Sequence, residues 1–182
     1  MISALLTAAL LATPIMGGDT VTINGNPCVV GFNATTASGA HRVLVLGACV
    51  GSTQTIAAAT PPAGTSSTPY VRVPGSTPIT VRGASSAPIG AQVCIAGPTS
   101  GYRCGTVQAK NVTVNFPGGT ITGLTRTSIC PSPREAGTPV MWRDQAQGVV
   151  VGGSGSCTSG GTTFFAPVVP ALAAWGVTLH TG

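Results

Sequence analysis

Acidic and histidine side chains, the groups that most often move protons in proteins, are scarce in this sequence of 182 residues. The chain has three acids and two histidines, which are Asp19, Glu135, Asp144, His41 and His180. Paired catalytic carboxylates or a hard-cation site would need several acids close together. Neither histidine has a second metal ligand about three to five residues away. We therefore expect no metal site and no cofactor, and we interpret both histidines as surface or core-edge residues.

The segment CPSPREAGTPV, from Cys130 to Val140, places Arg134 directly before Glu135. Beside a cleft, Arg134 would recognise an acidic or carboxylate group, and Glu135 would hold the arginine in position. The alternative is an exposed arginine and a glutamate that is neutralised locally. Both interpretations remain open from the sequence, and we favour the second.

The six cysteines are an even number, and no CxxC pair occurs among them. Cysteines of exported proteins generally pair as disulfides, whereas zinc and redox sites usually need closely spaced thiols. Disulfide bonds are therefore the better interpretation, although the sequence alone leaves every pairing of the six open.

Residues 1–14, MISALLTAALLATP, form an apolar run with no basic residue before it. The run has the length of a signal-peptide core and is shorter than the roughly 20 residues of a membrane-spanning helix. A misassigned start of the chain is the alternative. We expect a secreted, extracellular protein with no membrane insertion after export.

Charged residues make up 6% of the chain, and its eight basic residues are scattered singly. Nucleic-acid binding usually needs a basic stripe interleaved with aromatic residues, so we do not expect it here. The 26 glycines and 15 prolines favour turns, and short alternating runs recur between them. In NVTVNF, for example, Val112, Val114 and Phe116 would line one face of a strand. This rhythm predicts an all-β barrel or sandwich.

Two segments depart from the strand pattern. PVVPALAAWG predicts a short helix near the C-terminus, with Gly176 at its C-terminal cap. AATPPAGTSSTP, from Ala58 to Pro69, is rich in proline, serine and threonine and predicts an irregular connection.

Four stretches of the second half have a specific order and spacing: VCIAGPTSGYRCGTVQAKNVTVNF, GTITGLTRTSIC, QAQGVVVGGSGSCTSGGTTFF and PVVPALAAWGVTLHTG. They closely resemble the secreted bacterial chymotrypsin-like serine proteases of the streptogrisin and alpha-lytic protease group. The first half agrees through VLGACVG, where that family has Thr-Ala-Gly-His-Cys-Gly. The resemblance implies two six-stranded antiparallel β-barrels, at residues 15–85 and 86–182, with a cleft between them and a short C-terminal helix. It also implies three disulfides, Cys28–Cys49, Cys94–Cys104 and Cys130–Cys157.

The resemblance also locates the positions of the family's catalytic serine, histidine and aspartate. The serine position lies six residues after Cys130 and holds Ala136. The histidine position holds Ala48, and the aspartate position holds Ser67. The resemblance therefore predicts a family member without its catalytic triad, a pseudoprotease.

The loop that stabilises the oxyanion in this family is changed as well. Its positions hold Arg134, Glu135 and Ala136, so Arg134 replaces the first glycine and Glu135 replaces the acid beside the serine. The family's arginine partner for that acid is expected just after Cys94, where this chain has Ile95. We infer from the resemblance that the oxyanion site is also impaired.

A relocated catalytic group is the remaining route to hydrolysis. Ser128, Ser132 and Thr138 flank the loop, and His41 is the histidine nearest to the empty histidine position. A nucleophile needs a base within about 3 Å and a group that orients that base. Because no acid lies near His41 in the sequence, we do not expect a relocated triad.

The segment that contains Val151, Gly152 and Gly153 matches the family's pocket wall, which pairs with an extended substrate. A cleft that still accepts a peptide as an added strand would bind an extended peptide, a protein or a protease inhibitor. The alternative is that these glycines serve only the turns of the barrel. We prefer an inactive, monomeric binding protein. A purely structural extracellular protein and an active serine endopeptidase are the alternatives.

Overall fold

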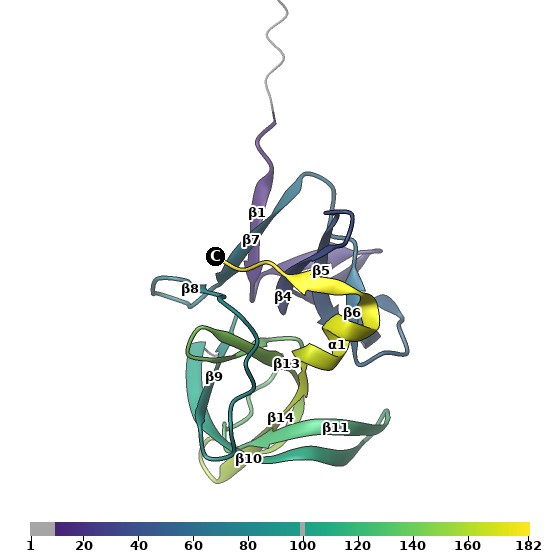
Figure 1. Ribbon diagram of the computed structural model, residues 1–182. Coiled ribbons are helices and arrows are strands. Elements are labelled where there is room, and N and C mark those ends of the chain that lie inside the picture. The colour runs from purple at the N-terminus through teal and green to yellow at the C-terminus, as the bar shows by residue number, and fades with distance from the viewer. Residues whose placement is uncertain (1–9, 99–100) are drawn as a thin grey trace, which may run out of the picture.

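The computed structural model describes residues 10–98 and 101–182 and consists almost entirely of β-strands (Figure 1). The strands form two halves, which follow one another in sequence and lie one above the other in Figure 1. The predicted short helix is present as α1, Val168–Trp175, and Gly176 caps its C-terminus in the left-handed conformation. No helix of the described part of the chain is long and apolar enough to cross a membrane.

The C-terminal half is a closed barrel with the strand order β10-β11-β14-β13-β12-β9. Every neighbouring pair in this barrel is antiparallel. Closure leaves no unpaired sheet edge around the ring. The strands are β9 Gln92–Gly97, β10 Gly101–Phe116, β11 Gly119–Thr127, β12 Pro139–Trp142, β13 Gln145–Ser156 and β14 Gly160–Pro167.

Alternation along β10 shows how the sequence produces this barrel. Val112, Val114 and Phe116 are half-buried and pack against the core, while the residues between them are exposed. Side chains at every second position of a strand point to the same face. The face predicted for these three residues is therefore confirmed. A separate apolar cluster that includes Val93, Ile95, Val107, Ile129 and Val150 also lies within this half.

The N-terminal half pairs its strands in three sheets, β1-β7-β8, β15-β4-β5-β6 and β2-β3. The pair β1–β7 is parallel, and its register shifts between Ile15 and Gly17. Among the described residues these three sheets are not joined into one closed ladder. The strands are β1 Thr13–Gly17, β2 Thr20–Ile23, β3 Asn26–Val29, β4 Phe32–Thr36, β5 His41–Leu46, β6 Ile56–Ala59, β7 Thr65–Val71 and β8 Ile79–Thr80.

The segment Ala58 to Pro69 is more regular than predicted. Strand β6 extends into its first residues and β7 covers its end, so only residues 60–64 connect two strands. Proline is tolerated at strand edges and strand starts, where its missing N–H is not needed. The expectation of an irregular connection across the whole segment was therefore wrong.

The C-terminal segment joins the two halves. After α1, strand β15, Val177–Leu179, pairs with β4 of the N-terminal half. The indole Nε1 of Trp175 donates to the backbone carbonyl of Ile56 at 2.8 Å. The same segment, yellow in Figure 1, runs from the barrel across the N-terminal strands.

A shared apolar core holds the halves together. It combines Phe32 and Leu44 of the N-terminal half with Met141 and Val149 of the barrel. At Gly31 a Cβ atom would lie 2.3 Å from the Val149 side chain, so only glycine allows this approach. The three disulfides expected from the resemblance are present, Cys28–Cys49, Cys94–Cys104 and Cys130–Cys157.

Candidate functional site

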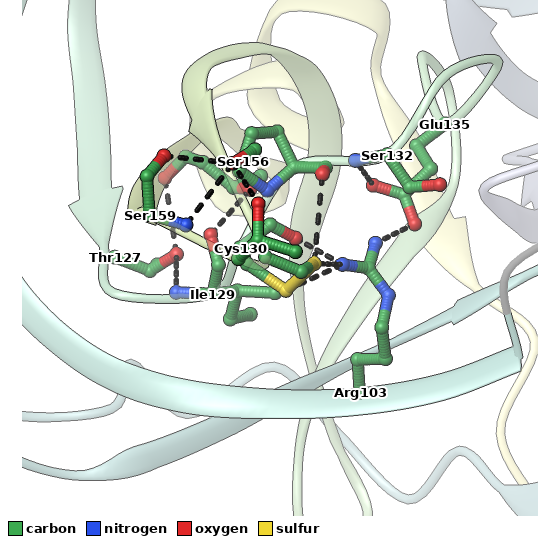
Figure 2. Close-up of a disulfide and its surroundings, with 12 residues drawn as sticks. Arg103, Thr127, Ile129, Cys130, Ser132, Glu135, Ser156 and Ser159 are labelled. Carbon is green, nitrogen blue, oxygen red and sulfur yellow. Dashed lines mark hydrogen bonds and ion pairs between the residues drawn. A yellow bond between two sulfur atoms is a disulfide. The ribbon is translucent and has the colours of Figure 1, made fainter.

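The loop between β11 and β12 is built around a buried ion pair. Glu135 is only 3% exposed, and its Oε1 accepts from Nη2 of Arg103 in strand β10. Its Oε2 accepts from the backbone N–H of Ser132 at 3.0 Å. Figure 2 shows the Arg103 guanidinium between Glu135 and the Cys130–Cys157 disulfide, where Nη1 also donates to the Cys130 carbonyl. The arginine thus ties the loop to the barrel wall.

Sequence reasoning missed Arg103, because it sought the arginine partner of Glu135 at position 95. In the structure Arg103 lies directly opposite Ile95 in the β9–β10 ladder, and Cys94 lies opposite Cys104. Residues that face each other across antiparallel strands project to the same face. The arginine is therefore supplied from the neighbouring strand, and the Cys94–Cys104 disulfide was the signal that could have found it.

Burial lowers the pKa of the Arg103 guanidinium from its usual value, since the charged form loses water contacts. An arginine remains protonated at neutral pH even so. Glu135 is thus neutralised by Arg103, and its carboxylate does not position Arg134 as the first interpretation required. Arg134 itself is exposed and has a backbone φ of 64°, in the left-handed region.

The loop residues converge on a cavity of about 170 Å³ in the C-terminal half. Arg134, Glu135 and Ala136 line one side of it, and Gly152 and Gly153 of β13 line the other. Ala136, which the resemblance assigns to the position of the family's serine, contributes only a methyl group to this wall. The structure therefore brings together the loop and most of the β13 segment that the sequence singled out.

A second cavity, of about 570 Å³, lies between the N-terminal half and the β10–β11 hairpin. Ala48, in the short 3₁₀ helix Gly47–Val50, and Val151 of β13 both line it. Phe116 lines it too, and a Cβ at Gly152 would lie 2.9 Å from the Phe116 ring. Ala48 and Ala136 thus face two cavities that meet along the β13 segment 151–153.

Along that segment, β13 has a neighbouring strand on only one side. It pairs with β14 at Gly152 and Gly153, whereas its ladder to β12 extends only to Val149. A strand with an unpaired side offers backbone donors and acceptors to an extended peptide.

Ser67 lines neither cavity. Its Oγ lies 2.6 Å from Nδ1 of His180, the residue that follows β15. The other histidine, His41, places Nε2 at 2.8 Å from Oδ1 of Asn33. Because Nδ2 of Asn33 donates to the carbonyls of Ile15 and Thr68, Oδ1 must accept from His41. Both histidines therefore belong to a polar cluster between the N-terminal sheets.

Each carboxylate of the three acidic side chains is paired with an arginine. The pairs are Asp19 with Arg72, Asp144 with Arg82 and Glu135 with Arg103. The side-chain contacts of both histidines are to Asn33 and Ser67, and neither contact is to a carboxylate. No acid in the described chain therefore orients a histidine as a catalytic base requires.

Of the three candidates for a relocated nucleophile, Ser132 lines the 170 Å³ cavity, whereas Ser128 and Thr138 do not. Ser128 Oγ accepts from the Thr106 backbone N–H at 2.9 Å, and Thr138 is fully buried. Among residues 10–98 and 101–182, no group of three or more His, Cys, Asp or Glu side chains could hold a metal ion.

Comparison with known proteins places these features in a family. Over 92% of its length the chain is 41% identical to streptogrisin-C of Streptomyces griseus and 34% identical to streptogrisin-A of the same organism. It superposes on protease A of Thermobifida fusca with a TM-score of 0.85 and 35% identity, covering 93% of this chain and 100% of that structure. The chain belongs to the streptogrisin family of chymotrypsin-like bacterial serine proteases.

Membership of the streptogrisin family confirms the mostly-β chymotrypsin-like fold with one short C-terminal helix. No family model matches the chain. The chain spans 41% of the length of streptogrisin-C and 62% of that of streptogrisin-A.

Proposed function

We propose that this chain is a secreted, catalytically inactive member of the streptogrisin family that binds an extended peptide segment of a partner in its cleft. The single observation that carries the proposal is the pair of alanines, Ala48 and Ala136, that face the two cavities where the family has its base and its nucleophile. A methyl group neither attacks a carbonyl nor accepts a proton.

The rest of the structure supports the loss of turnover. The three carboxylates pair with arginines, and the contacts of His41 and His180 lie in the cluster with Asn33 and Ser67. Serine proteases without their triad retain about 10³–10⁴-fold acceleration over water when the oxyanion hole is intact. Here Arg134 replaces the first glycine of that loop, so we expect even this residual rate to be reduced.

Peptide binding is supported by the shape of the cleft. Residues 151–153 have one unpaired side, and cavities of about 170 Å³ and 570 Å³ lie against them. Added strands gain affinity from backbone hydrogen bonds and specificity from pockets for alternate side chains. A peptide along β13 would place side chains in both cavities.

Secretion is proposed from the disulfides and the relatives. Three disulfides are expected only in an oxidising compartment, and the family consists of secreted bacterial proteases.

The loss of catalysis is tested with a fluorophosphonate probe and a chromogenic peptide mixture, and a streptogrisin serves as the positive control. We expect no covalent labelling and no cleavage above buffer. Stoichiometric labelling of any serine, located by peptide mass mapping, would overturn the proposal of inactivity.

Peptide binding is tested by capture of a random hexapeptide library on the immobilised protein. Ala48→Trp fills the 570 Å³ cavity from its wall, so it should abolish capture. Ala63→Trp is the matched control, because Ala63 is also exposed and does not line that cavity. Capture that is absent, or equal in both variants, would contradict binding in the cleft.

A further inference from the structure

Arg134 differs from most basic residues of the chain in having no side-chain partner among the residues that the structure describes. Three arginines pair with carboxylates, Arg42 donates to the His41 carbonyl, Lys110 donates to Ser86, and Arg143 lies over the Trp142 ring. Among the described residues, Arg126 and Arg134 are the two cations with no such contact. Of these two, only Arg134 lines the 170 Å³ cavity.

The charge of Arg134 is not cancelled by its neighbour. Both carboxylate oxygens of Glu135 are bound, Oε1 to Arg103 and Oε2 to the Ser132 N–H. Arg134 and Glu135 line the cavity, and Arg103 of strand β10 pairs with Glu135 from outside the lining, so the positive charge of Arg134 is left unbalanced. The other two acids, Asp19 and Asp144, have their own arginine partners. The carboxylates of Asp19, Glu135 and Asp144 are therefore committed to arginines other than Arg134.

The backbone of Arg134 supports a role in binding. Its φ of 64° lies in the region that glycine adopts readily and other residues rarely do. Residues held in such conformations cluster at binding and active sites, where the surrounding structure maintains them.

The cavity has room for one small acidic side chain. A water molecule takes up about 30 Å³, so 170 Å³ holds roughly five groups of that size. The side chain of glutamate has about that many heavy atoms beyond its Cα.

From these observations, we propose that the 170 Å³ cavity binds a carboxylate of the bound peptide, with Arg134 as its counter-ion. The carboxylate belongs either to an acidic side chain or to the peptide's C-terminus. This inference rests on the proposed binding of a peptide along residues 151–153 and names the chemical class of that peptide.

The test uses a hexapeptide library in which Glu and Gln are equally frequent at every position, prepared with free and with amidated C-termini. We expect captured peptides to favour Glu over Gln at one position by about tenfold at low salt, and less at 0.5 M salt. If the C-terminal carboxylate is the ligand, the preference will instead be for the free-acid library over the amidated one.

Arg134→Gln and Arg134→Gly should remove the preference. Arg126→Gln is the matched control and should retain it. The Arg134→Gly variant should also melt at the same or a higher temperature, which rules out unfolding as the cause.

The two proposals fail differently. If peptides are captured without any preference for a carboxylate, or if Arg126→Gln removes the preference as Arg134→Gln does, the inference about Arg134 is overturned and peptide binding stands. If no peptide of either library is captured, both are overturned.

Discussion

Two consecutive side chains in the loop before β12 have opposite environments. Glu135 is buried with its carboxylate bound to Arg103, whereas Arg134 is exposed in a left-handed backbone conformation. A buried acid needs an ionic partner, and a left-handed arginine needs surroundings that hold it there. At the scale of residues, the ion pair of Glu135 with Arg103 therefore holds the loop in place, while Arg134 puts a positive charge at the cavity.

Arg134→Gly should stabilise the protein. The left-handed conformation costs a non-glycine residue about 1–2 kcal/mol, and the greater backbone freedom of glycine offsets about half of that. We expect a gain of about 1 kcal/mol in the free energy of unfolding, or about 2–4 °C in Tm. Differential scanning calorimetry measures it, and a lower Tm than that of the unchanged protein would contradict the prediction.

The ion pair between Arg103 and Glu135 acts at the scale of elements, since it ties strand β10 to the loop between β11 and β12. The ladder between β9 and β10 sets its geometry, because it places Arg103 opposite Ile95. A charge placed on either of two facing positions reaches the same side of the sheet. The arginine that pairs with the loop glutamate can therefore come from either β9 or β10, and the loop itself need not change.

Removing both partners of this pair should cost less than the sum of the two single removals. Arg103→Gln and Glu135→Gln each leave a buried charge unpaired, and each should lower the free energy of unfolding by about 3 kcal/mol. The double variant should lose less than the sum, with a coupling of about 1–3 kcal/mol. Denaturant unfolding of the four proteins measures the coupling, with exposed Arg126→Gln as a control that should change stability by less than about 0.5 kcal/mol. Additive losses would contradict the pairing.

At the scale of the whole molecule, the C-terminal segment joins the halves on either side of the cleft. Strand β15 pairs with β4, and His180 directly after it contacts Ser67 of β7. His41 of β5 shares this cluster through Asn33, whose backbone carbonyl also accepts from the His180 N–H at 3.0 Å. These polar contacts therefore fix the C-terminal segment against the strands of the N-terminal half.

This cluster predicts a loss of stability in acid. Burial, and then the nearby His180 and Arg42, lower the pKa of His41 from the ordinary histidine value of about 6.5. The unfolded chain therefore binds a proton at His41 more readily than the folded one, and stability falls as the pH drops below about 6.5. His41→Gln retains an N–H donor for Asn33 and should flatten this dependence. Urea unfolding between pH 7.5 and 5 measures it, and equal pH slopes would contradict the role of His41.

Local patterns were sufficient for α1 with its Gly176 cap and for strands such as β10, although not for β7, because strand alternation and helix capping depend on neighbours in the chain. The all-β class followed from the same patterns, whereas the pairing of the cysteines came only from the family resemblance. Arg103 could also have been predicted from the sequence. The Cys94–Cys104 pair sets the register of β9 and β10, in which Arg103 lies opposite Ile95. Arg103 was missed because the arginine partner of Glu135 was sought only on strand β9 and not on the neighbouring strand β10.

Contacts between distant residues needed the tertiary structure. Arg103 and Glu135 are 32 residues apart, and Ser67 and His180 are 113 apart. No local pattern reports such pairs, since they depend on how strands from different parts of the chain stack. The same holds for the two cavities on either side of residues 151–153. Composition and spacing along the chain sufficed to predict the kind of fold, whereas packing across it decided which charges are neutralised and placed the unpaired Arg134 at a cavity.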